Sequence, residues 1–410
     1  MTGTLASVTA AGPSLFAIPL EFFFFGVTLV GVALFHKQAL SIAVGGLAAV
    51  LIYKLVFGFH IVHHLGEEWR ILTNLLGLLL GFALLANHFE ESHIPRVLPA
   101  ILPDDWKGGL MLLAIVFVLS TFLDNIAAAM IGGTIARTVF RGKVHVGFLA
   151  AIVAASNAGG AGSVVGDTTT TMMWIDGVSA LWVLKAGLGA VVALLCFGGI
   201  AALQQHKHQP IVKDSEGGFR IDWVRVLIVL VILGGTIATN ILLDFPAVGV
   251  WIAILLGAFL RKTAWRELPG ALKGSCFLLS LVLSASMMPV DRLPPASWQT
   301  ALGLGFVSSV FDNIPLTKLA LEQQGYDWGF LAYAVGFGGS MIWFGSSAGV
   351  AITIAFPEGR SVGRWLKHGW YIVPAYVIGF FAMLLLVGWH PQNYPRKGKR
   401  AVETTVAPAR

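Results

Sequence analysis

Long apolar runs alternate with short polar connections along almost the whole chain. Eight such runs lie near residues 14–35, 37–58, 70–89, 178–204, 223–243, 246–260, 270–289 and 366–389. An α-helix needs about 20 predominantly apolar residues to cross the hydrocarbon core of a bilayer. The pattern therefore predicts an all-α polytopic membrane protein.

Four further apolar stretches are interrupted by polar residues. Stretches 144–175 and 328–356 are broken by Gly, Ser, Thr, Asn and Asp, whereas 108–140 and 299–322 are apolar at both ends and turn-like at the centre. Backbone that is not helical at membrane depth must be buried in protein or line a cavity. We therefore expect these four stretches to meet in the interior.

The basic residues indicate how the spans are oriented, because Lys and Arg concentrate in cytoplasmic loops. One set of connections holds Lys37; Arg137, Arg141 and Lys143; Lys207, Lys213 and Arg220; Arg261, Lys262 and Arg266; and Arg360, Arg364 and Lys367. The opposite set holds mainly Arg70, Lys185 and Arg292. The two sets stay apart only if 108–140 and 299–322 are re-entrant hairpins, the first open to the cytoplasm and the second to the exterior. The basic tail (Arg396, Lys397, Lys399, Arg400) then falls on the outer side, against the rule.

The two halves of the chain repeat the same motifs. Ser120-Thr-Phe-Leu-Asp124-Asn125-Ile126 matches Ser308-Ser-Val-Phe-Asp312-Asn313-Ile314, and Gly159-Gly160 with Gly166-Asp167-Thr168 matches Gly338-Gly339 with Gly345-Ser346-Ser347. The first half starts outside and the second inside, so the repeats are inverted. Inverted repeats with interrupted segments in matching positions are typical of secondary transporters, whose site lies near the midplane.

Composition excludes several classes of protein. The chain of 410 residues is 56% hydrophobic and 12% charged, against about 25% charged residues in soluble domains, which excludes an ordinary soluble enzyme or a disordered chain. The net charge of +6 is spread over short loops and does not indicate a nucleic-acid partner. Residues 1–13 lack the basic segment of a signal peptide. No Gly-x4-Gly-Lys-Ser/Thr loop for ATP is present, so we expect gradient-driven transport, no enzymatic activity and no cofactor.

Three carboxylates interrupt apolar stretches: Asp124, Asp167 and Asp312. A charged side chain at bilayer depth costs several kcal/mol, so an acid placed there is functional by default. The structural alternative is an acid that caps a half-helix. Carboxylate and amide oxygens together suit a hard cation, and the neighbours Asn125, Asn157, Asn313 and Thr168–Thr170 add such oxygens. The same carboxylates can carry a proton, and competition between the two ions at one group gives antiport.

An anionic substrate is the rival interpretation. None of the four motifs contains Arg or Lys, and Lys318 and Arg137 are expected nearer the membrane faces, which favours a cation. Hydroxyls, amides and half-helix N-termini also bind anions, however, so a cation-coupled carrier of an organic anion stays open. A channel or a purely structural membrane protein leaves the inverted hairpins unexplained.

The motif Ser156-Asn-Ala-Gly-Gly-Ala-Gly-Ser-Val-Val-Gly-Asp-Thr-Thr-Thr-Thr-Met-Met-Trp-Ile175 resembles the signature of the NhaD-type sodium/proton antiporters of the ion transporter superfamily. Asp312-Asn-Ile-Pro-Leu-Thr317 and the Asp124-Asn125 hairpin fit the same family. The resemblance implies an elevator-type fold, often a homodimer, in a bacterial inner membrane, with extrusion of Na⁺ or Li⁺ in exchange for H⁺. Relatives in the superfamily move citrate, dicarboxylates or arsenite.

The resemblance also implies the ion- and proton-binding residues. They are Asp124, Asn125, Asn157, Asp167, Thr169, Thr170, Asp312 and Asn313, with Ser340, Ser346 and Ser347 in the partner motif; Asp124, Asn125, Asn157, Asp167 and Asp312 would hold the Na⁺ or Li⁺ ion. The stretch Gly336–Ala348 matches the family pattern less closely.

The organisation of the chain follows from these assignments. We expect scaffold helices in 1–107 and 223–298, hairpins and broken helices of a transport domain in 108–177 and 299–357, a connecting helix and cytoplasmic linker in 178–222, and a last helix with a polar tail in 358–410. Two features stay open. Glu21 is either a relay acid or a scaffold acid paired across helices, and His60, His63, His64 and Glu67 share one helix face that suits an interfacial connector, a metal site or a pH sensor.

Overall fold

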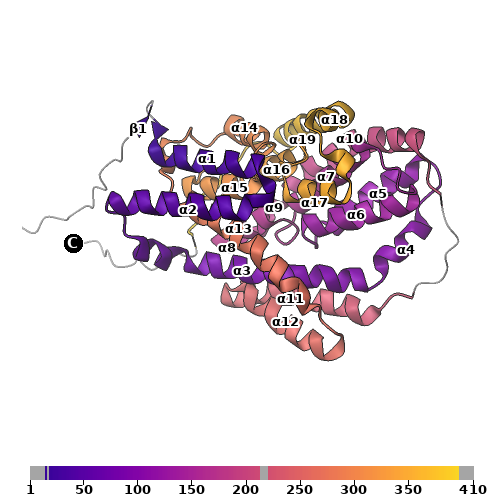
Figure 1. Cartoon of the computed structure of the whole chain (residues 1–410), viewed down its shortest axis with the longest axis horizontal. Coiled ribbons are helices and arrows are strands. Elements are labelled where there is room, and N and C mark those ends of the chain that lie inside the picture. The colour runs from indigo at the N-terminus through magenta and orange to yellow at the C-terminus, as the bar shows by residue number, and fades with distance from the viewer. Residues whose placement is uncertain (1–13, 16–17, 213–219, 397–410) are drawn as a thin grey trace, which may run out of the picture.

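The computed structural model describes residues 14–15, 18–212 and 220–396. The N-terminal residues 1–13, Lys213, and Lys397, Lys399 and Arg400 of the basic tail lie outside the described residues. Apart from one short antiparallel pair, β1 (Ser14–Leu15) with β2 (Ile18–Pro19), the regular structure described is helical. The predicted all-α polytopic fold is confirmed (Figure 1).

Two groups of three helices occupy matching places in the two halves. They are α1 (Leu20–Leu34), α2 (Ala39–Val56) and α3 (Ile61–Glu91), then α11 (Trp223–Leu243), α12 (Pro246–Leu260) and α13 (Leu268–Ser286). Short 3-10 turns lie at His36–Gln38, Trp265–Glu267, Val290–Arg292 and Pro357–Gly359. The helix α3 begins before the predicted span because the histidine-rich segment is itself helical.

The remaining helices form the hairpins and broken spans. In the first half these are α5 (Trp106–Leu119) and α6 (Asn125–Val139), α7 (Val146–Ala161) and α8 (Thr168–Asp176), followed by α9 (Ala180–Leu184) and α10 (Ala186–His208). In the second half they are α14 (Trp298–Ser308) and α15 (Asn313–Gln323), α16 (Trp328–Gly338) and α17 (Ser347–Ala355), followed by α18 (Val362–His368) and α19 (Ile372–Leu386). The order of elements predicted from the repeat is therefore present in both halves.

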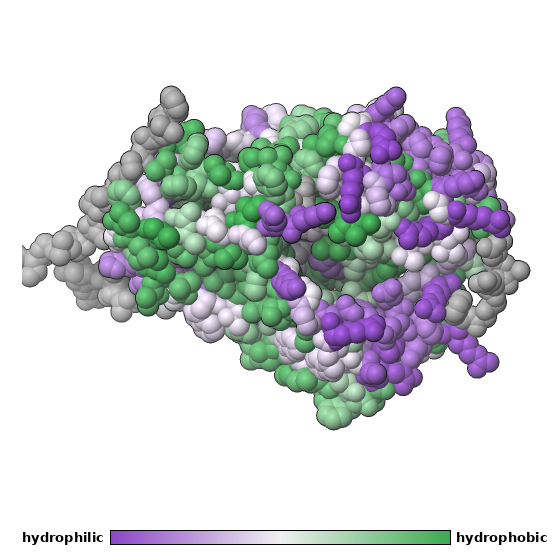
Figure 2. All heavy atoms as spheres, viewed as in Figure 1, coloured by the Kyte–Doolittle hydropathy of each residue, from purple (hydrophilic) through white to green (hydrophobic). Residues whose placement is uncertain are grey.

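Apolar side chains cover much of the outer surface. Leu34 of α1, Ile52 of α2, Ile241 of α11 and Phe259 of α12 are more than half exposed, which a bilayer tolerates and water does not. Among the described helices, five are long and apolar enough to cross a membrane, or six if the bent pair α18–α19 counts as one span. Figure 2 shows hydrophobic residues over α1 and α2 and hydrophilic residues gathered toward the right of the view. The chain is an integral, multi-pass membrane protein.

The two hairpins open toward opposite ends of the molecule. We call the end beside residues 209–212 and 220–222 the linker end and the end beside residues 387–396 the tail end (Figure 1). The first hairpin finishes at the linker end, where Val212 N donates to Val139 O at 2.8 Å, and it starts there too, because Gly108 packs against Ile211. The second hairpin starts and finishes at the tail end, where Gln323 Nε2 donates to Pro294 O at 2.7 Å. Each hairpin therefore enters and returns on one side, as the basic residues predict.

Glycines allow each broken span to lie directly against its hairpin. A Cβ on Gly159 of α7 would collide with the carbonyl oxygen of Phe117 in α5, and one on Gly338 of α16 would collide with that of Gly305 in α14. The two contacts are equivalent under the repeat. These glycines therefore permit a close approach of the two backbones in each half.

One helix was not anticipated from the sequence. Helix α4 (Ile94–Ile101) follows His93, which has a left-handed φ of 65°, and it contains Pro95 in its first turn and Pro99 in its interior. Two prolines in eight residues hide a helix from pattern analysis, since proline is tolerated in a first turn but disfavoured beyond it.

Candidate cation site

Four helices begin at the centre of the molecule, two at hairpin tips and two at the breaks. Their N-cap residues are Asp124 (α6), Asp167 (α8), Asp312 (α15) and Ser346 (α17), whose side-chain oxygens accept from the backbone N–H of Ile126 at 2.8 Å, Thr169 at 2.9 Å, Ile314 at 3.0 Å and Gly349 at 3.3 Å. The capping role considered as an alternative is therefore real. Each aspartate uses Oδ1 for the cap, so its Oδ2 is available for other partners.

A hydrogen-bonded group of amides and hydroxyls joins the two repeats. Asn157 Oδ1 in α7 accepts from Asn125 Nδ2 at 3.0 Å, and Asn157 Nδ2 lies 3.0 Å from Ser340 Oγ and 3.1 Å from Ser346 Oγ. All four side chains are at least 94% buried. Asn157 thus connects the first hairpin to the second broken span.

Asp167 lies beside this group and is contacted from both hairpins. Its Oδ2 is 3.4 Å from Asn125 Nδ2 and 3.5 Å from Asn313 Nδ2, which are weak bonds, and the residue is only 2% exposed. Among the described residues, no Lys, Arg or His forms an ion pair with it. A buried carboxylate without a base must be neutralised by another route, and a proton or a bound cation does so.

Asp124 and Asp312 flank the centre in equivalent positions. Asp124 Oδ2 accepts from Thr168 Oγ1 at 3.5 Å, and Asp312 Oδ2 accepts from Ser347 Oγ at 3.3 Å. Thr168 and Ser347 are also equivalent under the repeat. No ion pair to a base involves either aspartate within the described part of the chain.

Both flanking aspartates border a space between the site and the surrounding helices. Asp312 lines an apolar cavity of about 230 Å³ whose other walls include Leu29 of α1 and Phe277 of α13. Asp124 and Asp167 line a narrow crevice beneath Leu75 and Leu78 of α3. These spaces separate the half-helix ends from α1, α3 and α13.

The repeat is broken at the two positions nearest the centre. The first half places Asn157 and Asp167 where the second half places Gly336 and Ser346. A Cβ on Gly336 would lie 3.6 Å from Asp167 Oδ2, so its absence leaves room beside that oxygen. The single buried carboxylate at the centre makes one asymmetric site and not two equal ones.

The sequence-predicted residues divide into three groups. Six form the central cluster: Asn125, Asn157, Asp167, Asn313, Ser340 and Ser346. Asp124, Asp312 and Ser347 flank it. Thr169 supplies the cap N–H, and its buried hydroxyl has no hydrogen-bond partner among the described residues. The Thr170 hydroxyl donates to the carbonyl oxygens of Ser163 and Asp167 and stabilises the break. Thr168 was expected to add a hydroxyl beside the carboxylates but was not among the residues that the resemblance implies; it contacts Asp124 as its repeat equivalent Ser347 contacts Asp312.

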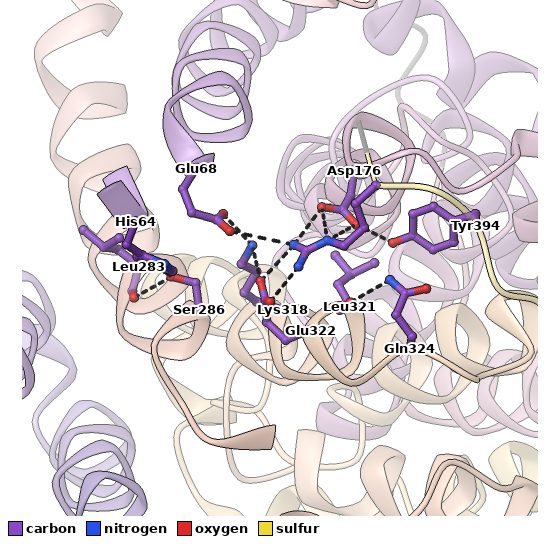
Figure 3. Close-up of polar contacts among 11 residues, drawn as sticks. His64, Glu68, Asp176, Leu283, Ser286, Lys318, Leu321, Glu322, Gln324 and Tyr394 are labelled. Carbon is purple, nitrogen blue, oxygen red and sulfur yellow. Dashed lines mark hydrogen bonds and ion pairs between the residues drawn. The ribbon is translucent and has the colours of Figure 1, made fainter. Parts of the chain in front are cut away.

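The nearest bases are engaged away from the site. Arg137 donates to Ala355 O and lies over the ring of Phe356. Lys318, which was expected nearer a membrane face, is fully buried: its Nζ lies 2.6 Å from Glu68 Oε2 and 2.9 Å from Glu322 Oε1 (Figure 3). Its two acidic partners could not be recognised from the local sequence. Neither base is free to hold an anionic substrate.

The structure shows what two open features contact. Glu21 of α1 forms an ion pair with Lys54 of α2 at 3.1 Å, which is the cross-helix pairing considered as one of its two roles. His64 Nε2 lies 2.8 Å from Ser286 Oγ, and the exposed His63 lies 3.7 Å from Glu67. Among the described residues, no group of three or more His, Cys, Asp or Glu is placed to hold a metal ion. A cation at the centre would therefore depend largely on amide, hydroxyl and backbone oxygens beside Asp167.

The chain is similar to curated sodium/proton antiporters, while no protein-family model matches it. It is 28% identical over 279 residues to "Sodium/proton antiporter 1" of Arabidopsis thaliana, covering 58% of this chain and 48% of that protein. It is 26% identical over 339 residues to "Na(+)/H(+) antiporter NhaD" of Alkalimonas amylolytica, covering 67% of each chain. It is 28% identical over 331 residues to the protein of the same name from Vibrio cholerae, covering 66% of this chain and 68% of that protein.

The matches thus span about half the length of the first relative and about two thirds of the NhaD proteins. They agree with the resemblance read from Ser156–Ile175 and from the Asp-Asn motifs. The chain is a relative of the NhaD-type sodium/proton antiporters.

Proposed function

We propose that the chain is a secondary active transporter that exchanges Na⁺ or Li⁺ for H⁺ across a bacterial inner membrane. The observation that carries the proposal is Asp167: a buried carboxylate without a base, surrounded by amides and hydroxyls from both repeats. Relatives named sodium/proton antiporters support it.

The chemistry follows from the cost of burying an unpaired charge. The site is stable with a proton on Asp167, or with a cation whose charge balances the carboxylate, but not when ionised and empty. Asn125, Asn157 and the flanking Asp124 and Asp312 would replace part of the hydration shell of the ion. If the empty ionised site cannot readily change sides, one ion moves only in exchange for the other.

The remaining assignments extend this proposal. The hairpins and broken spans would move as a transport domain against scaffold helices α1–α3 and α11–α13, in an elevator-type motion within a homodimer. A cation-coupled carrier of an organic anion is less well supported, because Arg137 and Lys318 have other partners.

The test is ion exchange in proteoliposomes that contain a pH dye. Addition of Na⁺ or Li⁺ should move protons in the opposite direction, whereas K⁺ and citrate should not. Asp167→Asn keeps the Oδ1 acceptor of the helix cap and removes the charge, so it should abolish exchange in a folded protein. The matched control is Asp291→Asn, an exposed acid away from the site. Wild-type exchange by Asp167→Asn, or a response to citrate alone, would overturn the proposal.

A further inference from the structure

A second group of buried charged residues lies at the tail end, apart from the cation site. Its members are Glu68 of α3, Asp176 of α8, Lys318 and Glu322 of α15, and Arg396 beyond α19; we call it the tail-end charge cluster. Asp176 and Lys318 are fully buried, and Glu68 is 2% exposed. Figure 3 shows Glu68, Asp176, Lys318 and Glu322 turned toward one another. The proposed exchange chemistry uses none of them.

Arg396 contacts two carboxylates from different repeats. Its Nη1 and Nη2 donate to the two oxygens of Glu322 at 2.6 and 2.8 Å, while Nε and Nη2 donate to Asp176 at 3.0–3.2 Å. A planar guanidinium suits such two-pronged contacts, because its donors are fixed relative to one another. A lysine at this position has no such geometry.

The segment that carries Arg396 is itself held in place. His390 N donates to Asp327 Oδ2 at 2.9 Å, Gln392 N donates to Tyr326 O at 3.0 Å, and Tyr394 donates to Asp176. Trp328 Nε1 also donates to Gln392 O at 2.8 Å. Arg396 is therefore a fixed contact and not a mobile tail residue.

The two carboxylates held by Arg396 lie on the helices that supply the cation site. Asp176 is the last residue of α8, which is capped by Asp167, and Glu322 lies in the last turn of α15, which is capped by Asp312. Among the hydrogen bonds of the described residues, the weak one from Asn313 Nδ2 to Asp167 Oδ2 at 3.5 Å is what joins the N-terminal ends of these helices. Their far ends are joined by Arg396, roughly 13 Å away for a helix the length of α8.

Loss of Arg396 would leave like charges facing each other. Within the described part of the chain, Asp176 has no other basic partner, whereas Glu322 keeps Lys318 at 2.9 Å. Two buried carboxylates without the bridging cation repel each other, which favours separation of α8 from α15. Because both helices are short and stiff, that separation would widen the space between Asp167 and Asn313.

We propose that Arg396 is a positioning residue for the cation site, which clamps the far ends of α8 and α15 and so sets the spacing of Asp167 and Asn313. The inference rests on the proposed exchange of cations for protons at this site. It assigns the segment after the last helix a role in cation affinity.

The test compares Arg396→Met and Arg396→Lys with the control Arg292→Met. Arg292 is exposed and pairs with its neighbour Asp291. Exchange rates are measured against Na⁺ concentration in proteoliposomes, and melting of the purified proteins is followed separately. Arg396→Met should raise the KM for Na⁺ about tenfold or more, since small misplacements of binding groups have large effects. The maximal rate should change by less than about threefold, which separates positioning from a general loss of active protein. Arg292→Met should behave as wild type.

The adjacent carboxylate provides a second test if Arg396→Met does not fold. Asp176→Asn removes one end of the clamp without leaving an unpaired charge, so it should raise the KM by a smaller factor. Combining it with Arg396→Met should lower the KM relative to Arg396→Met alone, and Arg396→Lys should fall between Arg396→Met and wild type. An unchanged KM for Na⁺ in both Arg396→Lys and Asp176→Asn would overturn the inference. So would variants that lose maximal rate and melting temperature together while their KM for Na⁺ stays unchanged. Absence of Na⁺-dependent exchange in the wild type would instead overturn the proposed function.

Discussion

Replacement of Lys318 by Met should destabilise the protein strongly. The Lys318 ammonium bridges Glu68 at 2.6 Å and Glu322 at 2.9 Å, and all three side chains are at least 90% buried. Without Lys318, Glu322 keeps its two-pronged contact with Arg396, but Glu68 keeps only a distant contact with the same guanidinium at 3.8 Å. Removing one partner of a buried ion pair costs about 3–5 kcal/mol, because the remaining charge is left buried.

A second substitution distinguishes the stranded charge from lost packing. Glu68→Gln combined with Lys318→Met removes both charges of the closest pair, so the double variant should be more stable than Lys318→Met alone. The coupling free energy between the two positions should be about 1–3 kcal/mol.

The measurement is reversible unfolding in mixed micelles, followed by far-UV circular dichroism. Lys107→Met is the control, because Lys107 is 65% exposed and its contact with Asp105 is 3.8 Å long. A change of less than about 1 kcal/mol for Lys318→Met would place its contribution in the range of surface pairs and refute the reasoning. A double variant as unstable as the sum of the two single variants would do the same.

Two further predictions concern backbone packing and pH. Gly338→Ala should lower the stability by about 1–3 kcal/mol, since the new Cβ would meet the backbone of Gly305. In the control Gly303→Ala in α14, the new Cβ would meet nothing within 4 Å, so this variant should be neutral or stabilising. Thermal melts of the two variants test this, and equal melting temperatures would contradict the contact. At the linker end, a hydrogen bond from Arg261 lowers the pKa of Asp222 below its ordinary value of 3.8. Asp222 also caps α11, so Asp222→Ala should lower the stability by about 1 kcal/mol at pH 7. A carboxyl group whose pKa is lowered by folding stabilises the fold at pH values above its pKa in the unfolded chain. The difference in stability between the wild type and Asp222→Ala should therefore shrink as the pH falls below 3.8. A difference in melting temperature that does not change with pH would contradict the ion pair.

Most of the fold could be predicted from the sequence because a bilayer imposes simple constraints. Apolar runs predict the spans, and the distribution of basic residues together with the repeat predicts two hairpins with opposite openings. Helix α4 escaped because its prolines obscure the pattern. Arg396 conflicted with the distribution of basic residues, and the structure supplies the reason: its charge is balanced by Asp176 and Glu322 inside the protein.

The candidate site could be predicted where the chemistry is local, and only there. An acid within an apolar stretch stands out, so Asp124, Asp167 and Asp312 were found, and their amide neighbours followed. The burial and pairing of Lys318 could not be predicted, because its partner Glu68 lies 250 residues away in the chain. The link from Arg396 to Asp176 spans 220 residues. Contacts of this kind depend on how the folded helices pack, and they leave no pattern in the amino-acid sequence.

The position of Arg396 beyond the last helix has a consequence for biosynthesis. Ribosomes make the chain from its N-terminus, so α8 and α15 enter the bilayer before the guanidinium that joins them exists. Until then Asp176 faces Glu322 without its bridging base, and α8 and α15, which frame the candidate site, lack their final spacing. On the proposed function, we expect an incomplete chain to bind Na⁺ poorly, so that it does not dissipate the ion gradients of the cell that is making it.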